Sequence, residues 1–115
     1  MITKKSINIP IFRLKLKIVV VDDIKEALEV EPNIDTGADS CIIDHNNGTA
    51  TIVIASNDMS VIAHECLHVK NAVWIRIGYS PNSMNDEVDA YLLDYIMAEV
   101  LKVVEKHTNK TLLKI

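Results

Sequence analysis

The segment from residue 56 to residue 78 carries a complete set of helix signals, and it constrains the fold more than any other part of the chain. Ser56-Asn57-Asp58 offers side-chain oxygens that can accept hydrogen bonds from the first free N–H groups of a helix. Gly78 stands where a left-handed C-terminal cap is expected, so the helix should end near Ile77. Apolar residues recur between these ends and predict a largely buried helix: Val61, Ile62, Ala63, Leu67, Val69, Ala72 and Val73.

Residues 64–68 read His-Glu-Cys-Leu-His, an HExxH motif in the middle of this helix. His64 and His68 lie one turn apart on one face, so both imidazoles can reach a single ion. Zinc accepts imidazole nitrogen, and catalytic zinc sites use three protein ligands and leave the fourth position to water. Glu65 projects beside the two histidines, where a general base for that water belongs. The motif therefore predicts a Zn²⁺ site with His64 and His68 as ligands.

A candidate third ligand opens the next expected helix, which should run from about Asn85 to about His107 and lie deep in the core. Asp86, Glu87 and Asp89 all fall in its first turn, where negative charge also complements the helix dipole without any metal. Because HExxH lies upstream, we expect Glu87 to bind the metal. For Asp86 and Asp89 we expect only that their negative charges complement the helix dipole.

An HExxH helix, followed by a helix whose glutamate has Ala three and Tyr four positions later, resembles the gluzincin branch of the zincin metallopeptidases. The resemblance covers about residues 57–95, and it implies that His64, His68 and Glu87 bind zinc. It also implies that Glu65 activates a zinc-bound water to hydrolyse peptide bonds. Very short HExxH proteins of this kind look similar to peptidases encoded by bacteria and phages. The resemblance also implies a His or Tyr that stabilises the oxyanion, and Tyr91 is one candidate. Because Tyr91 lies one turn after Glu87 on the same face, the role we expect for it is a hydrogen bond to a ligand. The other candidates for the oxyanion are Tyr79, Tyr95 and His107.

The first half of the chain predicts a small sheet. Residues 7–21 are expected to form one strand, with Arg13, Lys15 and Lys17 on a solvated face or along an edge. Asp22 or Asp23 can cap a short helix that Pro32 stops. Asn47-Gly48 predicts a hairpin between strands at residues 41–43 and 51–55.

The predicted fold class is therefore α+β, with residues 1–115 forming a single zincin-like domain. Its three-stranded, mostly antiparallel sheet is joined by the short helix, the HExxH helix and the long buried C-terminal helix. The sequence leaves residues 108–115 open between a short strand and a frayed end.

The charge and the cysteine content limit the kinds of partner and the compartment that we expect for this protein. The net charge is −4 and no aromatic residues interleave with the basic stripe, so we expect neither nucleic acid nor a membrane as a partner. Two cysteines, Cys41 and Cys66, form no disulfide framework, and no signal peptide or membrane span is evident, so we expect a cytoplasmic protein. Both cysteines are interpreted as apolar filler and His45 as a turn residue.

Two functions remain open at this point. In the first, the chain is a zinc metallopeptidase acting on a peptide or protein. In the second, it is a non-enzymatic zincin-like interaction module with a structural or vestigial metal site. The chain has no second lobe to form the far wall of a cleft, so a partner or another copy of the chain would complete it.

Overall fold

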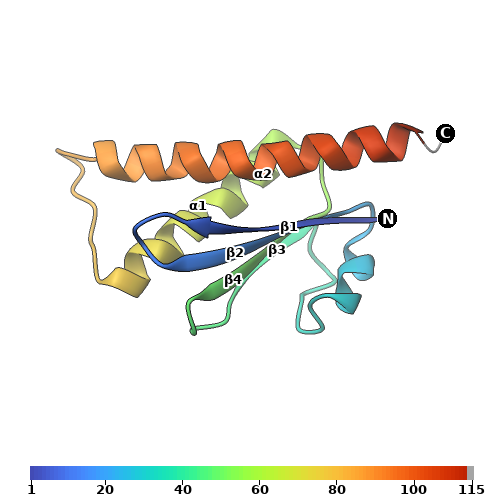
Figure 1. Ribbon diagram of the computed structural model, residues 1–115, viewed down its shortest axis with the longest axis horizontal. Coiled ribbons are helices and arrows are strands. Elements are labelled where there is room, and N and C mark those ends of the chain that lie inside the picture. The colour runs from blue at the N-terminus through green and yellow to red at the C-terminus, as the bar shows by residue number, and fades with distance from the viewer. Residues whose placement is uncertain (114–115) are drawn as a thin grey trace.

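The computed structural model describes residues 1–113, with side chains up to residue 110. The elements run in the order β1 (Ile2–Ile9), β2 (Leu14–Val21), a 3-10 helix η1 (Ile24–Glu29), β3 (Ser40–Asp44), β4 (Thr49–Ile54), α1 (Met59–Ile77) and α2 (Glu87–Leu113). The strands form one sheet in the order β1-β2-β4-β3, and both long helices cover the same face of it (Figure 1). The predicted α+β class is confirmed.

The sheet is mixed and has one strand more than predicted. β1 and β2 form an antiparallel hairpin, β2 pairs in parallel with β4, and β3 and β4 are antiparallel. The prediction of a single strand over residues 7–21 is therefore wrong. The chain turns at residues 10–13, where Pro10 offers no N–H and Ile11 and Arg13 have positive φ angles of 73° and 54°.

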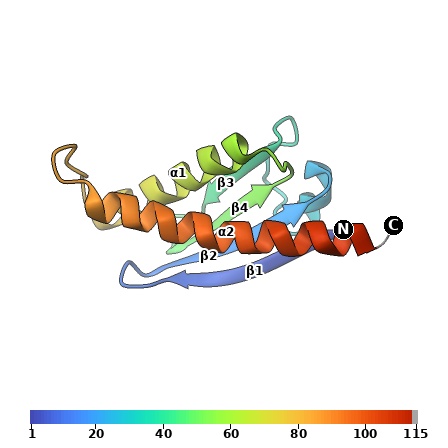
Figure 2. The same cartoon turned by 90° about the horizontal axis from the view of Figure 1, so that it is seen from above.

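The two sheet faces are buried unequally. Figure 2 shows α1 lying over β3 and β4, and α2 lying over β1 and β2. The main core fills this space, and its fully buried side chains include Leu16, Ile52, Ile62, Val69, Val73 and Ile96. On the other face, η1 and Ile34 cover only the end of the sheet formed by Val19, Val21 and Val53.

The predicted hairpin and both predicted helix caps ahead of α2 are confirmed. β3 and β4 are joined through residues 45–48, with Gly48 at φ 89°. Asp23 caps η1 in a capping box with Glu26. The side chain of Asp58 accepts from the backbone N–H of Ser60 at the start of α1.

The long C-terminal helix begins two residues later than predicted and continues through residue 113, past the predicted end near His107. Residues 108–113 therefore belong to α2, and the rest of the predicted tail, residues 114–115, lies outside the described residues. Among the helices described, none combines the length and apolar content that a membrane crossing requires.

Gly78 ends α1 in the left-handed conformation, with φ 72°. A Cβ atom at this position would meet no other atom within 4 Å, so the backbone angle alone determines the cost of a side chain. Gly78→Ala should therefore lower the free energy of unfolding by about 1 kcal/mol, measured by urea titration with circular dichroism. Ser80→Ala, in the exposed loop that follows, should change it by far less. Equal losses in the two variants would contradict this assignment.

Candidate functional site

The two HExxH histidines lie side by side on an exposed face of α1. The Nε2 atoms of His64 and His68 are 3.1 Å apart, and the rings meet edge to face with centroids 4.7 Å apart. Two nitrogen ligands bound tetrahedrally to zinc at 2.0–2.1 Å stand about 3.3 Å from each other. The histidine pair therefore has nearly the spacing that a shared zinc ion requires.

Glu65 differs from its neighbours in the motif because it is buried, with 8 % of its surface exposed. Burial chiefly raises the pKa of the Cys41 thiol in β3, and the charge of Glu65 adds to that rise. Burial and then Glu65 likewise raise the pKa of Cys66 to about 12. Both thiols are therefore protonated at neutral pH in the metal-free protein, so neither is a ready thiolate nucleophile. Unlike the two thiols, Glu65 carries a carboxylate, a group that can serve as a general base. Its carboxylate forms no hydrogen bond with another described residue.

A hollow of about 440 Å³ lies beside His68, between α1 and β3. Ile42 and Asp44 of β3 form one wall, and Asn71, Ala72 and Ile75 of α1 form the other with His68. Because β3 is the last strand of the sheet, its far side pairs with no other described strand. His68 of the pair therefore borders a groove next to an open strand edge.

Glu87 is exposed at the first residue of α2 and is not brought to the histidines. Residues 1–113 contain no group of three or more His, Cys, Asp or Glu side chains placed to hold a metal ion. Tyr91 is also exposed, at 67 %. The ligand role of Glu87 and the role of Tyr91 near the ligands stay predictions.

Asp89, two residues after Glu87, is the acidic residue of α2 whose side chain contacts α1. Its carboxylate lies 2.8 Å from the Nζ atom of Lys70 and accepts a hydrogen bond from the Nε1–H of Trp74. Residues two apart on a helix point about 200° away from each other, so Glu87 faces away from α1. Asp89 thus does more than complement the helix dipole, which is all that its position in the sequence indicated.

The remaining tyrosine and histidine candidates have structural partners. Tyr79 packs on Trp74 with ring centroids 4.6 Å apart, and Tyr95 packs against the main core. His45, predicted as a turn residue, lies 3.1 Å from the hydroxyl of Thr51 through its Nε2 atom. None of these contacts brings them to the histidine pair.

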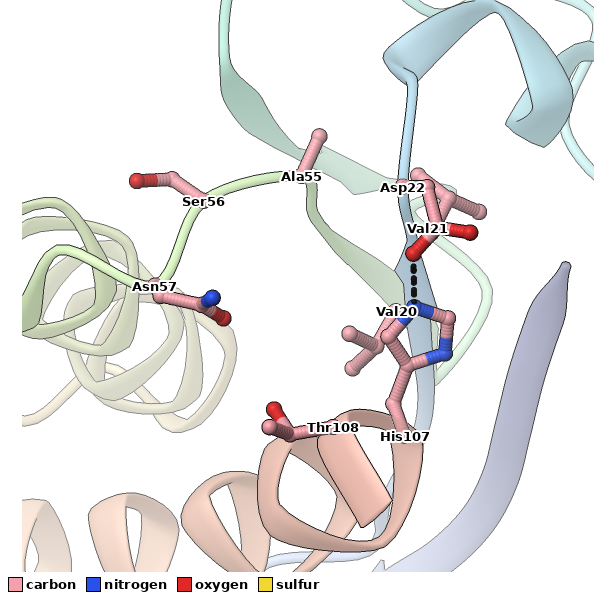
Figure 3. Close-up of a pocket in the computed structure, with 8 residues that line it drawn as sticks. All are labelled: Val20, Val21, Asp22, Ala55, Ser56, Asn57, His107 and Thr108. Atoms are coloured by element: carbon pink, nitrogen blue, oxygen red, sulfur yellow. Dashed lines mark hydrogen bonds and ion pairs between the residues drawn. The ribbon is translucent and has the colours of Figure 1, made fainter. Parts of the chain in front are cut away.

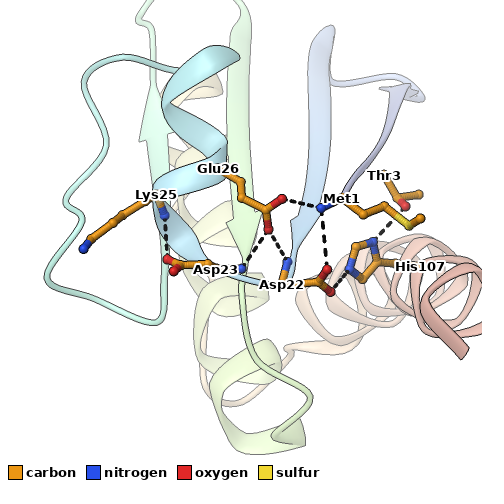
Figure 4. Close-up of polar contacts among 7 residues, drawn as sticks. All are labelled: Met1, Thr3, Asp22, Asp23, Lys25, Glu26 and His107. Atoms are coloured by element: carbon orange, nitrogen blue, oxygen red, sulfur yellow. Dashed lines mark hydrogen bonds and ion pairs between the residues drawn. The ribbon is translucent and has the colours of Figure 1, made fainter. Parts of the chain in front are cut away.

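His107 is buried, with 4 % of its surface exposed, and belongs to a polar cluster that the sequence did not predict. Its Nδ1 atom lies 2.8 Å from the hydroxyl of Thr3, and its Nε2 atom lies 2.8 Å from the carboxylate of Asp22 (Figure 4). The hydrogen bond with His107 is the main cause that lowers the pKa of Asp22. The N-terminal ammonium of Met1 contacts Asp22 and Glu26 in the same cluster.

This cluster joins β1, the end of β2 and α2, and it forms one wall of a hollow of about 250 Å³. Figure 3 shows His107 and Asp22 on one side of that hollow and residues 55–57 on the other. Thr3 is only 2 % exposed, so its hydroxyl is closed to a substrate. We therefore interpret the cluster as a structural link. No signal in the sequence could have revealed it, since the partners of His107 lie 85 and 104 positions away.

The structure thus brings His64 and His68 together, with the buried Glu65 between them in the sequence, and does not bring Glu87 to them. Within residues 1–113, no other His, Cys, Asp or Glu completes a three-ligand group with the pair. Comparisons of the chain with protein-family models, curated proteins and solved structures found no match.

Proposed function

We propose that the chain is a small zinc-dependent metallopeptidase in which His64 and His68 hold the metal and Glu65 is the general base. The observation that carries this proposal is the 3.1 Å Nε2–Nε2 spacing of a histidine pair on α1, where the residue after His64 is the buried Glu65. When bound, zinc would polarise the scissile carbonyl and lower the pKa of water.

Glu65 would take the proton of the attacking water and return it to the leaving amine. Its place in the sequence, its free oxygens and its burial support this role. The carboxylate follows His64 directly on α1, and no hydrogen bond with another described residue engages its oxygens. Burial also removes competing bulk water, which strengthens the electrostatic interactions of the carboxylate.

The groove beside His68 supports a peptide as substrate. An extended peptide can add to the free edge of β3 through backbone hydrogen bonds, as strands do in sheets. Its side chains would then meet Ile42, Ala72 and Ile75, which favour an apolar residue next to the scissile bond.

Glu87 is proposed as the third ligand on the resemblance alone. To face the histidines, the first turn of α2 would have to rotate by about half a turn and release Asp89 from Lys70. A carboxylate from a substrate-bound partner or from a second copy of the chain is the alternative source.

Zinc content tests the metal site directly. After dialysis against excess zinc and removal of free metal, we expect about one zinc ion per chain by mass spectrometry of the metal. His64→Ala should lose it, because a single remaining imidazole does not form a chelate. The matched control is His45→Ala, which removes an imidazole from the β3–β4 loop and should keep the ion. Zinc retained by His64→Ala would overturn the assignment.

A non-enzymatic role is the second candidate. The two histidines are exposed on the surface of α1, and no third ligand stands beside them among the described residues. Both features favour a metal ion that is shared with a ligand from another protein. In that case zinc would bind without peptide turnover. It would also shift the chain to a larger assembly in sedimentation experiments.

A further inference from the structure

Four lysines line a single hollow of about 320 Å³ between β1, the outer strand of the sheet, and α2. Lys4 and Lys5 come from β1, and Lys102 and Lys106 come from α2. The chain carries 16 acidic and only 12 lysine and arginine residues, so a third of its basic side chains gather at this one place. The fold brings them together from positions about a hundred residues apart.

Acidic partners do not account for this gathering. Of these four lysines, only Lys102 forms an ion pair with another described residue, Glu99 at 3.3 Å. The Lys102 side chain is 66 % exposed, where such pairs contribute little. Glu105 lines the neighbouring hollow together with Lys102 and Lys106 but forms no ion pair with either of them. These two lysines are also a like-charged pair one helical turn apart, an arrangement that destabilises a helix.

Protection of an edge strand explains only two of the four lysines. Charged side chains on such a strand discourage pairing with other chains, which explains Lys4 and Lys5. It does not explain Lys102 and Lys106 of α2, which stand between this hollow and a neighbouring one of about 360 Å³ and line both. Buried Val103 between these two lysines adds an apolar wall, which strengthens the field of the ammonium groups on this side of β1, those of Lys5, Lys102 and Lys106. Lys4 precedes Lys5 on the strand, so its side chain leaves from the opposite face of the sheet.

We propose that this hollow binds the phosphate groups of a small polyphosphate, of the di- or triphosphate class. Ammonium groups bind phosphate as point charges, and a compact polyanion neutralises several of them at once. The lining contains no aromatic side chain on which a base could stack, so the phosphates and not a nucleobase would be recognised. This inference is independent of the proposed peptidase.

Calorimetric titration with inorganic tripolyphosphate tests the proposal. The parent should bind it with an affinity that falls as salt rises. Lys5→Gln combined with Lys106→Gln should weaken binding by about tenfold or more, because each change removes a charge from the hollow and keeps the length of the side chain. The matched control, Lys15→Gln combined with Lys25→Gln, makes the same change in net charge elsewhere and should bind within about twofold of the parent.

Three outcomes would overturn the proposal. The first is no binding by the parent at low salt. The second is an equal loss in the control, which would mean that only net charge matters. The third concerns the source of the phosphates: ATP should bind about as well as tripolyphosphate and adenosine should not bind, so a clear preference for ATP together with adenosine binding would place the recognition on the base.

Discussion

Glu65→Gln is expected to abolish peptide hydrolysis while leaving zinc bound. The amide has the size and shape of the carboxylate, so a side chain that is only 8 % exposed should keep its buried place. An amide oxygen does not accept the proton of the attacking water at neutral pH. Loss of a general base lowers turnover by about 10² to 10⁴, and this loss should appear in kcat.

Turnover of fluorophore-labelled, denatured casein by the zinc-loaded protein measures this effect, with zinc content determined on the same samples. Glu105→Gln makes the same chemical change on the exposed side of α2 and should keep parental turnover. Unchanged hydrolysis by Glu65→Gln would refute the mechanism. Zinc binding with no hydrolysis by the parent itself would favour the interaction module instead.

Local signals account for the parts of the structure that the sequence predicted well. Asp58 and Gly78 mark the ends of α1 because a side-chain oxygen and a left-handed glycine act on their own neighbouring backbone. The spacing of His64 and His68 acts over one helical turn in the same way. The 3.1 Å pair therefore follows from the sequence once the helix is predicted.

The strand pairing depended on information that a local pattern does not contain. Alternation of apolar and basic residues continues from Ile11 to Ile18, straight through the end of the β1–β2 turn, so it conceals that turn. The parallel pairing of β2 with β4 joins Lys17 to Thr51 across an intervening helix and strand. Only the shared core beneath α1 and α2 specifies that neighbour.

The rotation of α2 was equally hidden. Glu87 and Asp89 are both acidic and lie in the same first turn, so either could have faced α1. Lys70 and Trp74 select the rotation of α2 that points Asp89 toward α1, because their buried ammonium and indole N–H need an acceptor at this contact. The family resemblance pointed to Glu87, and the packing of the two helices instead engages its neighbour.

The contact made by Asp89 is costly to break because Lys70 is only 7 % exposed. Burial raises the pKa of Asp89, but the hydrogen bonds from Lys70 and Trp74 and the Lys70 charge together lower it below its ordinary value. A carboxylate whose pKa is lower in the folded state contributes stability above its unfolded pKa. That contribution is lost as the pH falls below about 4.

Asp89→Ala should therefore lower the free energy of unfolding by about 3 kcal/mol or more at pH 7, because it leaves a buried ammonium without a counter-charge and an indole N–H without an acceptor. Urea titrations at pH 7 and pH 3 measure the difference from the parent, which should shrink at the lower pH. Asp86→Ala removes an exposed acid at the residue that precedes α2, whose carbonyl accepts from the N–H of Ala90. This variant therefore reports the local helix-end terms, capping and dipole together, about 0.5–2 kcal/mol. A loss in Asp86→Ala as large as that in Asp89→Ala would mean that local effects at the start of the helix, and not the contact with Lys70 and Trp74, are the source of the stability.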